Sequence, residues 1–281
     1  MKKLGGIMVL KNFSYDGQSL SEYDCMICTF GQGNSDVISN GSTLTLETIT
    51  SKQNYKNTII DTSYESINIT FSIAKMNCQN LDDNHFTASE IANISKWLNR
   101  KTYHKFIPEY DEDVDDVIYY EGTFTSIQTH YIGGQVVGFD LTFTTNAPWG
   151  YVDYSIKKKN VTELYLNNDS DDIGILYPNK FNIKLLGGTG SGDNSVLKIT
   201  NSSDLGHVTR IANCKQNEEI TMDCIHEIIQ STNHSTLYND FNYKFPRLKN
   251  TYYNSKNVIT FSIPCDVEIN YPIVRKVGII V

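Results

Sequence analysis

The sequence has no long hydrophobic run and no recognisable export signal. None of its apolar stretches approaches the roughly 18 residues that identify a membrane-spanning helix. Gly5 to Leu10 is too short to be the apolar part of a signal peptide. We therefore expect a chain that is made in the cytoplasm without export and does not insert into a membrane.

Clustered positive charge is also scarce. The 281 residues include 24 Lys and Arg against 32 Asp and Glu, which gives a formal net charge of -8. The one dense basic run is short, Lys157-Lys158-Lys159. Because neutralisation of phosphates supplies most of the affinity of nucleic-acid-binding proteins, this charge distribution disfavours specific binding of DNA or RNA.

The cysteines match neither a disulfide scaffold nor a zinc site. Six of them are scattered over a long chain, which is typical of a reducing compartment: Cys25, Cys28, Cys78, Cys214, Cys224 and Cys265. Cys25 and Cys28 have the C-x-x-C spacing of redox and zinc sites, but zinc would require a second pair. The surrounding run Y-D-C-M-I-C-T-F is typical of a strand, which would point the two thiols in different directions. We interpret both as small buried or half-buried residues.

Motifs of catalysis and of phosphate or calcium binding are missing as well. The six histidines show no H-E-x-x-H spacing, and G-x-S-x-G is absent. The run G-G-T-G-S-G at 187–192 lacks the GK[ST] ending of a P-loop, and D-E-D-V-D-D at 111–116 lacks the EF-hand glycine. Both are interpreted as loops. The fold decides whether two carboxylates lie at the distance that sugar hydrolysis requires, so the sequence leaves this possibility open. We predict no catalytic, cofactor-binding or metal-binding residues and no enzymatic activity.

Alternating strand patterns dominate the first half of the chain. Apolar residues recur with period two at 44–48 and at 67–73, the pattern of strands with one buried face. The segment 119–143 predicts a hairpin with its turn at Gly133-Gly134. Residues 102–110 also look extended. The first half is therefore expected to be β-rich.

One helix interrupts this pattern. Thr87 followed by Glu90 has the spacing of a capping box, and it precedes apolar residues on one helical face: Ile91, Ile94, Trp97 and Leu98. We expect the helix to end near Asn99 to Lys101. Trp97 is expected to anchor it on the sheet.

The segment F-T-T-N-A-P-W-G at 143–150 is expected to end the first domain. Pro148 has no N–H to donate to a sheet, and the pattern changes after Gly150. Residues 151–160 are polar and basic and are interpreted as a loop, and short strand candidates follow at 181–186, 196–200, 219–224, 225–230, 258–263 and 266–271. They favour a β-sandwich. We predict domains at 1–150 and 151–281, with the last strand a candidate to return to the first domain and Trp149 at the seam.

The order of these elements resembles the distal tail proteins of bacteriophages that infect Gram-positive bacteria. The resemblance rests on W-L-N-R-K at the end of the helix, N-A-P-W-G after the hairpin, and I-P-C-D-V-E-I-N-Y-P-I-V-R-K-V-G near the C-terminus. It implies a mainly β fold, in which an N-terminal sandwich or barrel-like domain with one inserted helix precedes a galectin-like C-terminal sandwich.

The same resemblance implies a structural role in the virion tail. Similar proteins form a hexameric ring through the N-terminal domain at the end of the tail tube. The ring joins the tube to the tail tip or tail-associated lysin protein, and often to receptor-binding proteins. DNA passing through the lumen would then meet an acidic or neutral wall.

Two other functions remain open. The first is a carbohydrate-binding module for host adhesion, with sugar-stacking candidates Tyr238, Tyr243, Tyr252 and Tyr253. The second is a tail-borne hydrolase of the cell wall, for which the sequence offers no recognisable nucleophile, metal set or acid pair.

Overall fold

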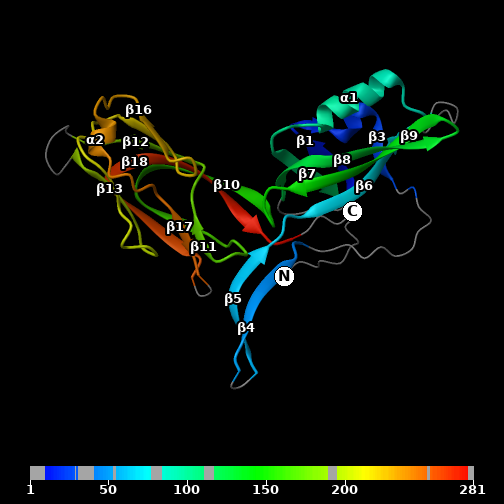
Figure 1. Cartoon of the computed structure of the whole chain (residues 1–281). Helices are drawn as coiled ribbons and strands as arrows, with labels where there is room; N and C mark the ends of the chain where they lie inside the picture. Colours follow the sequence, from blue (N-terminus) through cyan, green and yellow to red (C-terminus); the bar gives the residue numbers. More distant parts are fainter. Residues whose placement is uncertain are drawn as a thin grey trace. The chain divides into compact units, whose positions relative to one another are not determined.

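The computed structural model of the chain describes residues 10–28, 30, 41–52, 55–76, 84–110, 117–188, 195–251 and 254–277. The chain is mainly β and divides into two compact units (Figure 1). The first consists of Met1–Tyr151 with Arg275–Val281, and the second of Val152–Val274. No described helix is both long enough and apolar enough to span a bilayer.

The first unit is built on a seven-stranded sheet with the order β2-β1-β7-β8-β9-β6-β3. Its elements are β1 (Leu10–Tyr15), β2 (Gln18–Ser19), the 3-10 helix η1 (Leu20–Tyr23), β3 (Cys25–Cys28), β6 (Asn68–Lys75), α1 (Ala88–Leu98), β7 (His104–Tyr110), β8 (Tyr120–Ile132) and β9 (Gln135–Thr145). Figure 1 shows α1 lying over one side of this sheet. The strands β4 (Leu44–Thr50) and β5 (Asn57–Tyr64) pair only with each other among the described strands.

Local sequence signals account for much of this unit. The alternation at 67–73 is confirmed, because Ile67, Ile69, Phe71 and Ile73 are all buried. The β8–β9 turn is confirmed too, since Gly133 and Gly134 have φ of 60° and 81°, the left-handed values that a tight hairpin turn requires.

The helix begins as its capping box predicts. Thr87 Oγ1 accepts the N–H of Glu90 at 3.3 Å, and the Glu90 carboxylate accepts the N–H of Thr87 at 2.7 Å. The last helical residue is Leu98, immediately before the predicted end. Trp97 is 2% exposed, which confirms it as a core anchor.

The second unit contains a curled sheet with the order β14-β13-β18-β12-β15-β16, and β10 also pairs with β18. Its elements are β10 (Gly150–Asn167), β11 (Gly174–Leu176), β12 (Lys180–Leu185), β13 (Leu197–Asn201), β14 (Thr209–Ile211), β15 (Glu219–Asp223), β16 (Ile228–Ser231), α2 (Leu237–Asp240), β17 (Leu248–Asn250) and β18 (Lys256–Arg275). β11 and β17 form a separate pair. Strand candidates 181–186, 196–200 and 219–224 correspond to β12, β13 and β15 within one residue at each end.

Three expectations for this unit were wrong. The polar segment 151–160 belongs to β10, because its charged residues occupy an outer strand that pairs with β18. The candidates 258–263 and 266–271 are one strand, β18, whose inward residues continue to alternate past Pro264. Pro264 faces outward, and its carbonyl still accepts the N–H of Leu186 at 2.9 Å.

The third error concerns residues 225–227, which form a turn before β16. The Asp223 carboxylate accepts the N–H groups of Ile225 and His226 at 3.1 and 3.0 Å. Glu227 has a φ of 56°, which is outside the strand range.

Candidate assembly surface

The β4–β5 hairpin is the most unusual surface of the first unit. Every residue of both strands is exposed, although the alternation at 44–48 predicts one buried face. The predicted strand is confirmed. The predicted burial of one face is wrong, because the hairpin lies outside the seven-stranded sheet (Figure 1). Sequence periodicity reveals an apolar face but does not reveal what covers it.

One face of this hairpin carries most of its apolar side chains. Leu44 lies opposite Tyr64, Leu46 opposite Thr62, and Thr48 opposite Ile59. Residues directly opposite in an antiparallel pair share a face. The apolar members are 40–55% exposed: Leu44, Leu46, Ile59 and Tyr64. We call these four residues the apolar face of the hairpin.

The opposite face is mainly polar and acidic, with Ile49 across from Thr58 as an apolar exception. Glu47 lies directly across from Asp61, and Thr45 lies across from Ser63. Like charges directly opposite destabilise a strand pair. A two-stranded hairpin without further support is also at best marginally stable in water. Both observations indicate that this hairpin is only weakly stabilised by contacts within its own two strands.

The end of the hairpin nearest the core contacts the C-terminal segment of the same unit. Lys276 Nζ lies 4.7 Å from the centroid of the Tyr64 ring and donates to its hydroxyl at 3.2 Å. Nearby, Tyr120 donates its hydroxyl to the carbonyl of Val277 at 2.7 Å. The C-terminal residues thus contact both the hairpin and β8.

The C-x-x-C pair lies in a strand, β3, which pairs with β6. Cys25 is buried and Cys28 is half-buried. Burial raises the pKa of the Cys25 thiol to about 12 and that of Cys28 to about 11. Neither environment favours the thiolate that a redox-active cysteine uses as its nucleophile.

The remaining sequence candidates do not converge on one centre in the described residues. His104, His130 and His226 pair with Asp16, Asp140 and Asp223 respectively. Tyr238 and Tyr243 are 63% and 64% exposed. The acidic run 111–116, most of the glycine-rich loop, Cys78, Tyr252 and Tyr253 lie outside the described residues.

Sequence reasoning missed one buried polar cluster, in the second unit. His234 lies between two carboxylates, with Nδ1 2.9 Å from Glu218 Oε1 and Nε2 2.9 Å from Asp240 Oδ2. Cys214 is close by, and its Sγ and the ligand atoms of Glu218 and His234 lie within 4.8 Å of one another. The spacing C-x3-E-x15-H matches none of the motifs considered above, so only the fold reveals this group.

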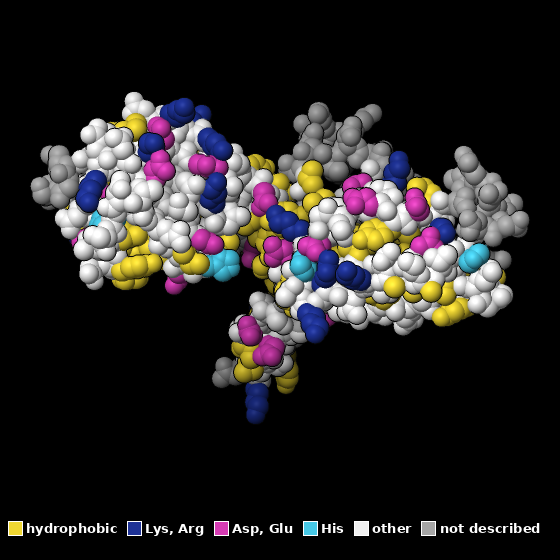
Figure 2. Space-filling model, turned by 90° about the horizontal axis from the view of Figure 1, so that it is seen from above, with side chains coloured by type: hydrophobic (Ala, Val, Ile, Leu, Met, Phe, Trp, Pro, Cys, Tyr) yellow, Lys and Arg dark blue, Asp and Glu magenta, His cyan; other side chains and the backbone are white. Residues whose placement is uncertain are grey.

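Charges on the surface are mixed. On the face seen in Figure 2, Lys and Arg side chains are interspersed with Asp and Glu, and no broad basic area is visible. Several lysines pair with carboxylates, such as Lys180 with Glu268 at 3.0 Å and Lys184 with Glu219 at 2.9 Å. Such a surface is not typical of nucleic-acid binding.

These features define a β protein of two compact units, with a hairpin whose apolar face is not covered within the described chain. Comparison with known proteins identifies its family. Residues 8–147 match the family described as phage tail protein N-terminal domain, and residues 149–271 match the phage tail C-terminal domain. The chain therefore belongs to the phage tail proteins and is a structural component of the phage tail. No curated protein matches the sequence significantly.

Solved structures with the same fold are distal tail and baseplate proteins. The Dit (gp 19.1) protein of phage SPP1, described as a paradigm of the hub adsorption apparatus in phages that infect Gram-positive bacteria, aligns with a TM-score of 0.61 at 12% identity, over 94% of this chain and 99% of that one. A chain of the phage P2 baseplate in its activated conformation with Ca aligns with a TM-score of 0.51 at 10% identity, over 94% and 98%. The predicted resemblance to the distal tail family and the mainly β fold are confirmed.

Proposed function

We propose that this chain is a distal tail protein that closes into a hexameric ring at the end of the tail tube. The ring acts as a hub between the tube and the tail tip or tail-associated lysin protein, and it carries receptor-binding proteins. Its role is structural and requires no catalytic centre. The observation that carries the proposal is the exposed apolar face of the β4–β5 hairpin on a distal-tail-protein fold.

A ring explains why the apolar face of the hairpin is left exposed in a single chain. In a ring, each subunit offers one surface to one neighbour and a different surface to the other, and rotation closes the set. The apolar hairpin of one subunit is then buried by the next subunit. Closure also protects the edges of the seven-stranded sheet, which otherwise tend to pair with other chains.

Light scattering coupled to size exclusion, with negative-stain images, tests this proposal on the full chain. We expect rings of six. A double variant of the apolar face, Leu46→Asp with Ile59→Asp, should give monomers, because burial of charge at a contact is strongly unfavourable.

The matched control is Thr45→Asp with Thr58→Asp, which adds the same charges to the opposite face of the same hairpin. All four positions are exposed in the single chain, so none of the changes should affect its folding. A wild-type chain that stays monomeric at high concentration contradicts the ring. Rings formed equally by both double variants show that the apolar face is not the contact.

A further inference from the structure

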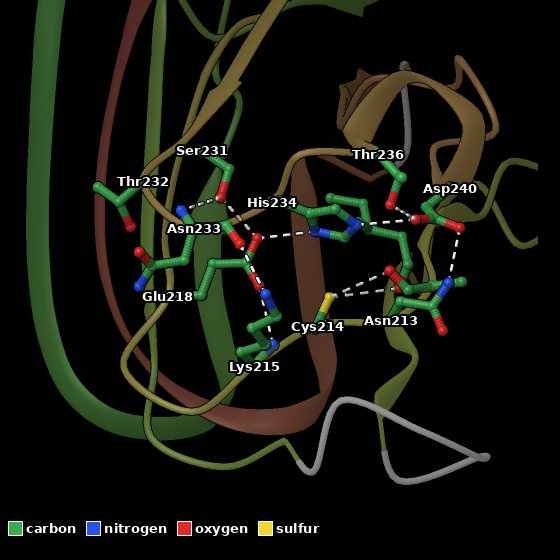
Figure 3. Close-up of polar contacts among 12 residues, drawn as sticks. Asn213, Cys214, Lys215, Glu218, Ser231, Thr232, Asn233, His234, Thr236 and Asp240 are labelled. Atoms are coloured by element: carbon green, nitrogen blue, oxygen red, sulfur yellow. Dashed lines mark hydrogen bonds and ion pairs between the residues drawn. The ribbon is translucent and has the colours of Figure 1, made fainter.

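The buried cluster around His234 joins two loops of the second unit, the β14–β15 connection and the β16–α2 connection (Figure 3). Cys214 follows β14, Glu218 precedes β15, and His234 lies between β16 and α2. The side chains of Glu218 and His234 are 0% and 3% exposed, and Cys214 is also fully buried. Thiol, imidazole and carboxylate groups converge here without access for bulk water.

We propose that Cys214, Glu218 and His234 form a binding site for a divalent transition-metal ion, with zinc as the best match. The three donors are one sulfur, one nitrogen and one oxygen, a set that zinc accepts and that calcium and magnesium do not favour. Zinc binds such atoms at about 2.0–2.3 Å, so its ligand atoms lie roughly 3–4 Å apart. The atoms here already lie within 4.8 Å of one another. To hold an ion, Cys214 Sγ would move closer and the Glu218–His234 pair, now 2.9 Å apart, would open slightly.

The surroundings of His234 match those of a metal-binding histidine. Such a residue usually gives the N–H of its second nitrogen to a carboxylate, which orients the ring. Asp240 Oδ2 accepts from Nε2 at 2.9 Å and leaves Nδ1 directed at Glu218. Asp240 itself is held by the Thr236 hydroxyl at 2.6 Å and the Asn213 amide at 2.8 Å, and these bonds lower its pKa together with the bond from His234.

Glu218 is oriented in the same way. Its Oε2 accepts the backbone N–H of Lys215 at 2.8 Å, and its Oε1 accepts the Ser231 hydroxyl at 2.6 Å. The carboxylate therefore needs no large rearrangement to offer Oε1 to a metal ion. A ligand that is already oriented loses little conformational entropy on binding.

Zinc binding to the full chain tests this inference. After treatment with a chelator and dialysis, titration calorimetry with zinc chloride should show one site per chain. Zinc should also raise the melting temperature, since a ligand that binds only the folded state stabilises it. Calcium and magnesium chloride should have no such effect.

The variant Cys214→Ser should weaken zinc binding more than about tenfold, and Asp240→Asn, which alters only the orienting carboxylate, should weaken it about 10–100-fold. The matched control is Cys265→Ser. Cys265 is as buried as Cys214 and also donates to a backbone carbonyl, that of Val161 at 3.6 Å, but it lies outside the cluster. The Cys265→Ser variant should therefore bind zinc as tightly as the wild type.

If Cys214→Ser does not fold, the absorption spectrum of the wild type with cobalt(II) decides. A thiolate-to-cobalt charge-transfer band that Cys265→Ser retains supports the site. Absence of zinc binding by the wild type, or equal binding by Cys214→Ser, overturns it. If Cys214→Ser binds zinc as tightly as the wild type and His226→Gln does not bind it, the zinc belongs to the exposed Asp223–His226 pair. Ring assembly is measured separately, so either proposal can fail without the other.

Discussion

Trp97 of α1 donates its indole N–H to the backbone carbonyl of Tyr15, at 2.9 Å, and so ties the helix to the end of β1. The indole ring also stacks on Phe13 and Tyr23, with ring centroids 5.6 and 4.4 Å apart. Trp97 is thus the largest of the three helix side chains buried in the core of the first unit, beside Ile94 and Leu98.

Replacing Trp97 with Ala should cost about 3–5 kcal/mol in the free energy of unfolding of the first unit, because the change leaves a cavity and removes a buried hydrogen bond. Urea denaturation followed by circular dichroism measures this. Lys96→Ala, on the exposed side of the same helix, should stay within about 0.5 kcal/mol of the wild type. Equal effects of the two changes would contradict the anchoring role.

Glu90 should give the first unit a pH-dependent stability. Its ion pair with Lys75, at 2.9 Å, and its bonds to Thr87 lower the pKa of the carboxyl to about 2, from 4.5. The stabilisation is therefore complete above about pH 4.5 and is lost as the pH falls through about 2.

At pH 7, Glu90→Gln should cost about 1 kcal/mol, less than the pKa shift alone suggests, because solvent screens a side chain that is 37% exposed. The difference from the wild type should vanish near pH 2. Urea denaturation at several pH values provides the test, with the exposed Glu65→Gln as control. A difference that persists unchanged at the acidic end would argue against an ionic contribution.

The buried thiols should resist alkylation in the native protein. Burial holds the pKa values of Cys25 and Cys265 at about 12, so almost no thiolate is present near pH 8. Treatment with iodoacetamide followed by peptide mass spectrometry should leave both unlabelled until the chain is denatured. Rapid labelling of Cys25, or a Cys25–Cys28 disulfide, would instead indicate a redox function.

The acidic pair of the hairpin should limit its stability. Asp61→Asn keeps the acceptor for the N–H of Thr62, which lies at 2.8 Å, and removes the repulsion from Glu47. In the single chain this should stabilise the hairpin by about 0.2–1 kcal/mol. Amide hydrogen exchange in β4 and β5 measures the gain.

Glu47→Gln should give the same gain, and combining the two changes should add nothing, because either one removes the same repulsion. Fully additive gains would show that the two carboxylates act independently.

The features that the sequence predicted correctly depend on neighbours in the chain. The Thr87–Glu90 capping box, the Gly133-Gly134 turn and the alternation from Ile67 to Ile73 each involve residues a few positions apart. Local geometry sets the cap and the turn, and the alternation sets which residues of β6 share a face. The length of β18 was missed because Pro264 normally ends a strand, and only the outward position of Pro264 makes the strand continuous.

The sequence by itself determined the β-rich character, the position of the helix, the absence of common catalytic motifs and, through the order of its segments, the resemblance to distal tail proteins. The tertiary structure decided that the apolar face of the β4–β5 hairpin is exposed. It also brought Cys214, Glu218 and His234 together. Both depend on how separate strands and loops meet in the folded chain, and periodicity describes the pattern of a segment without specifying its partner.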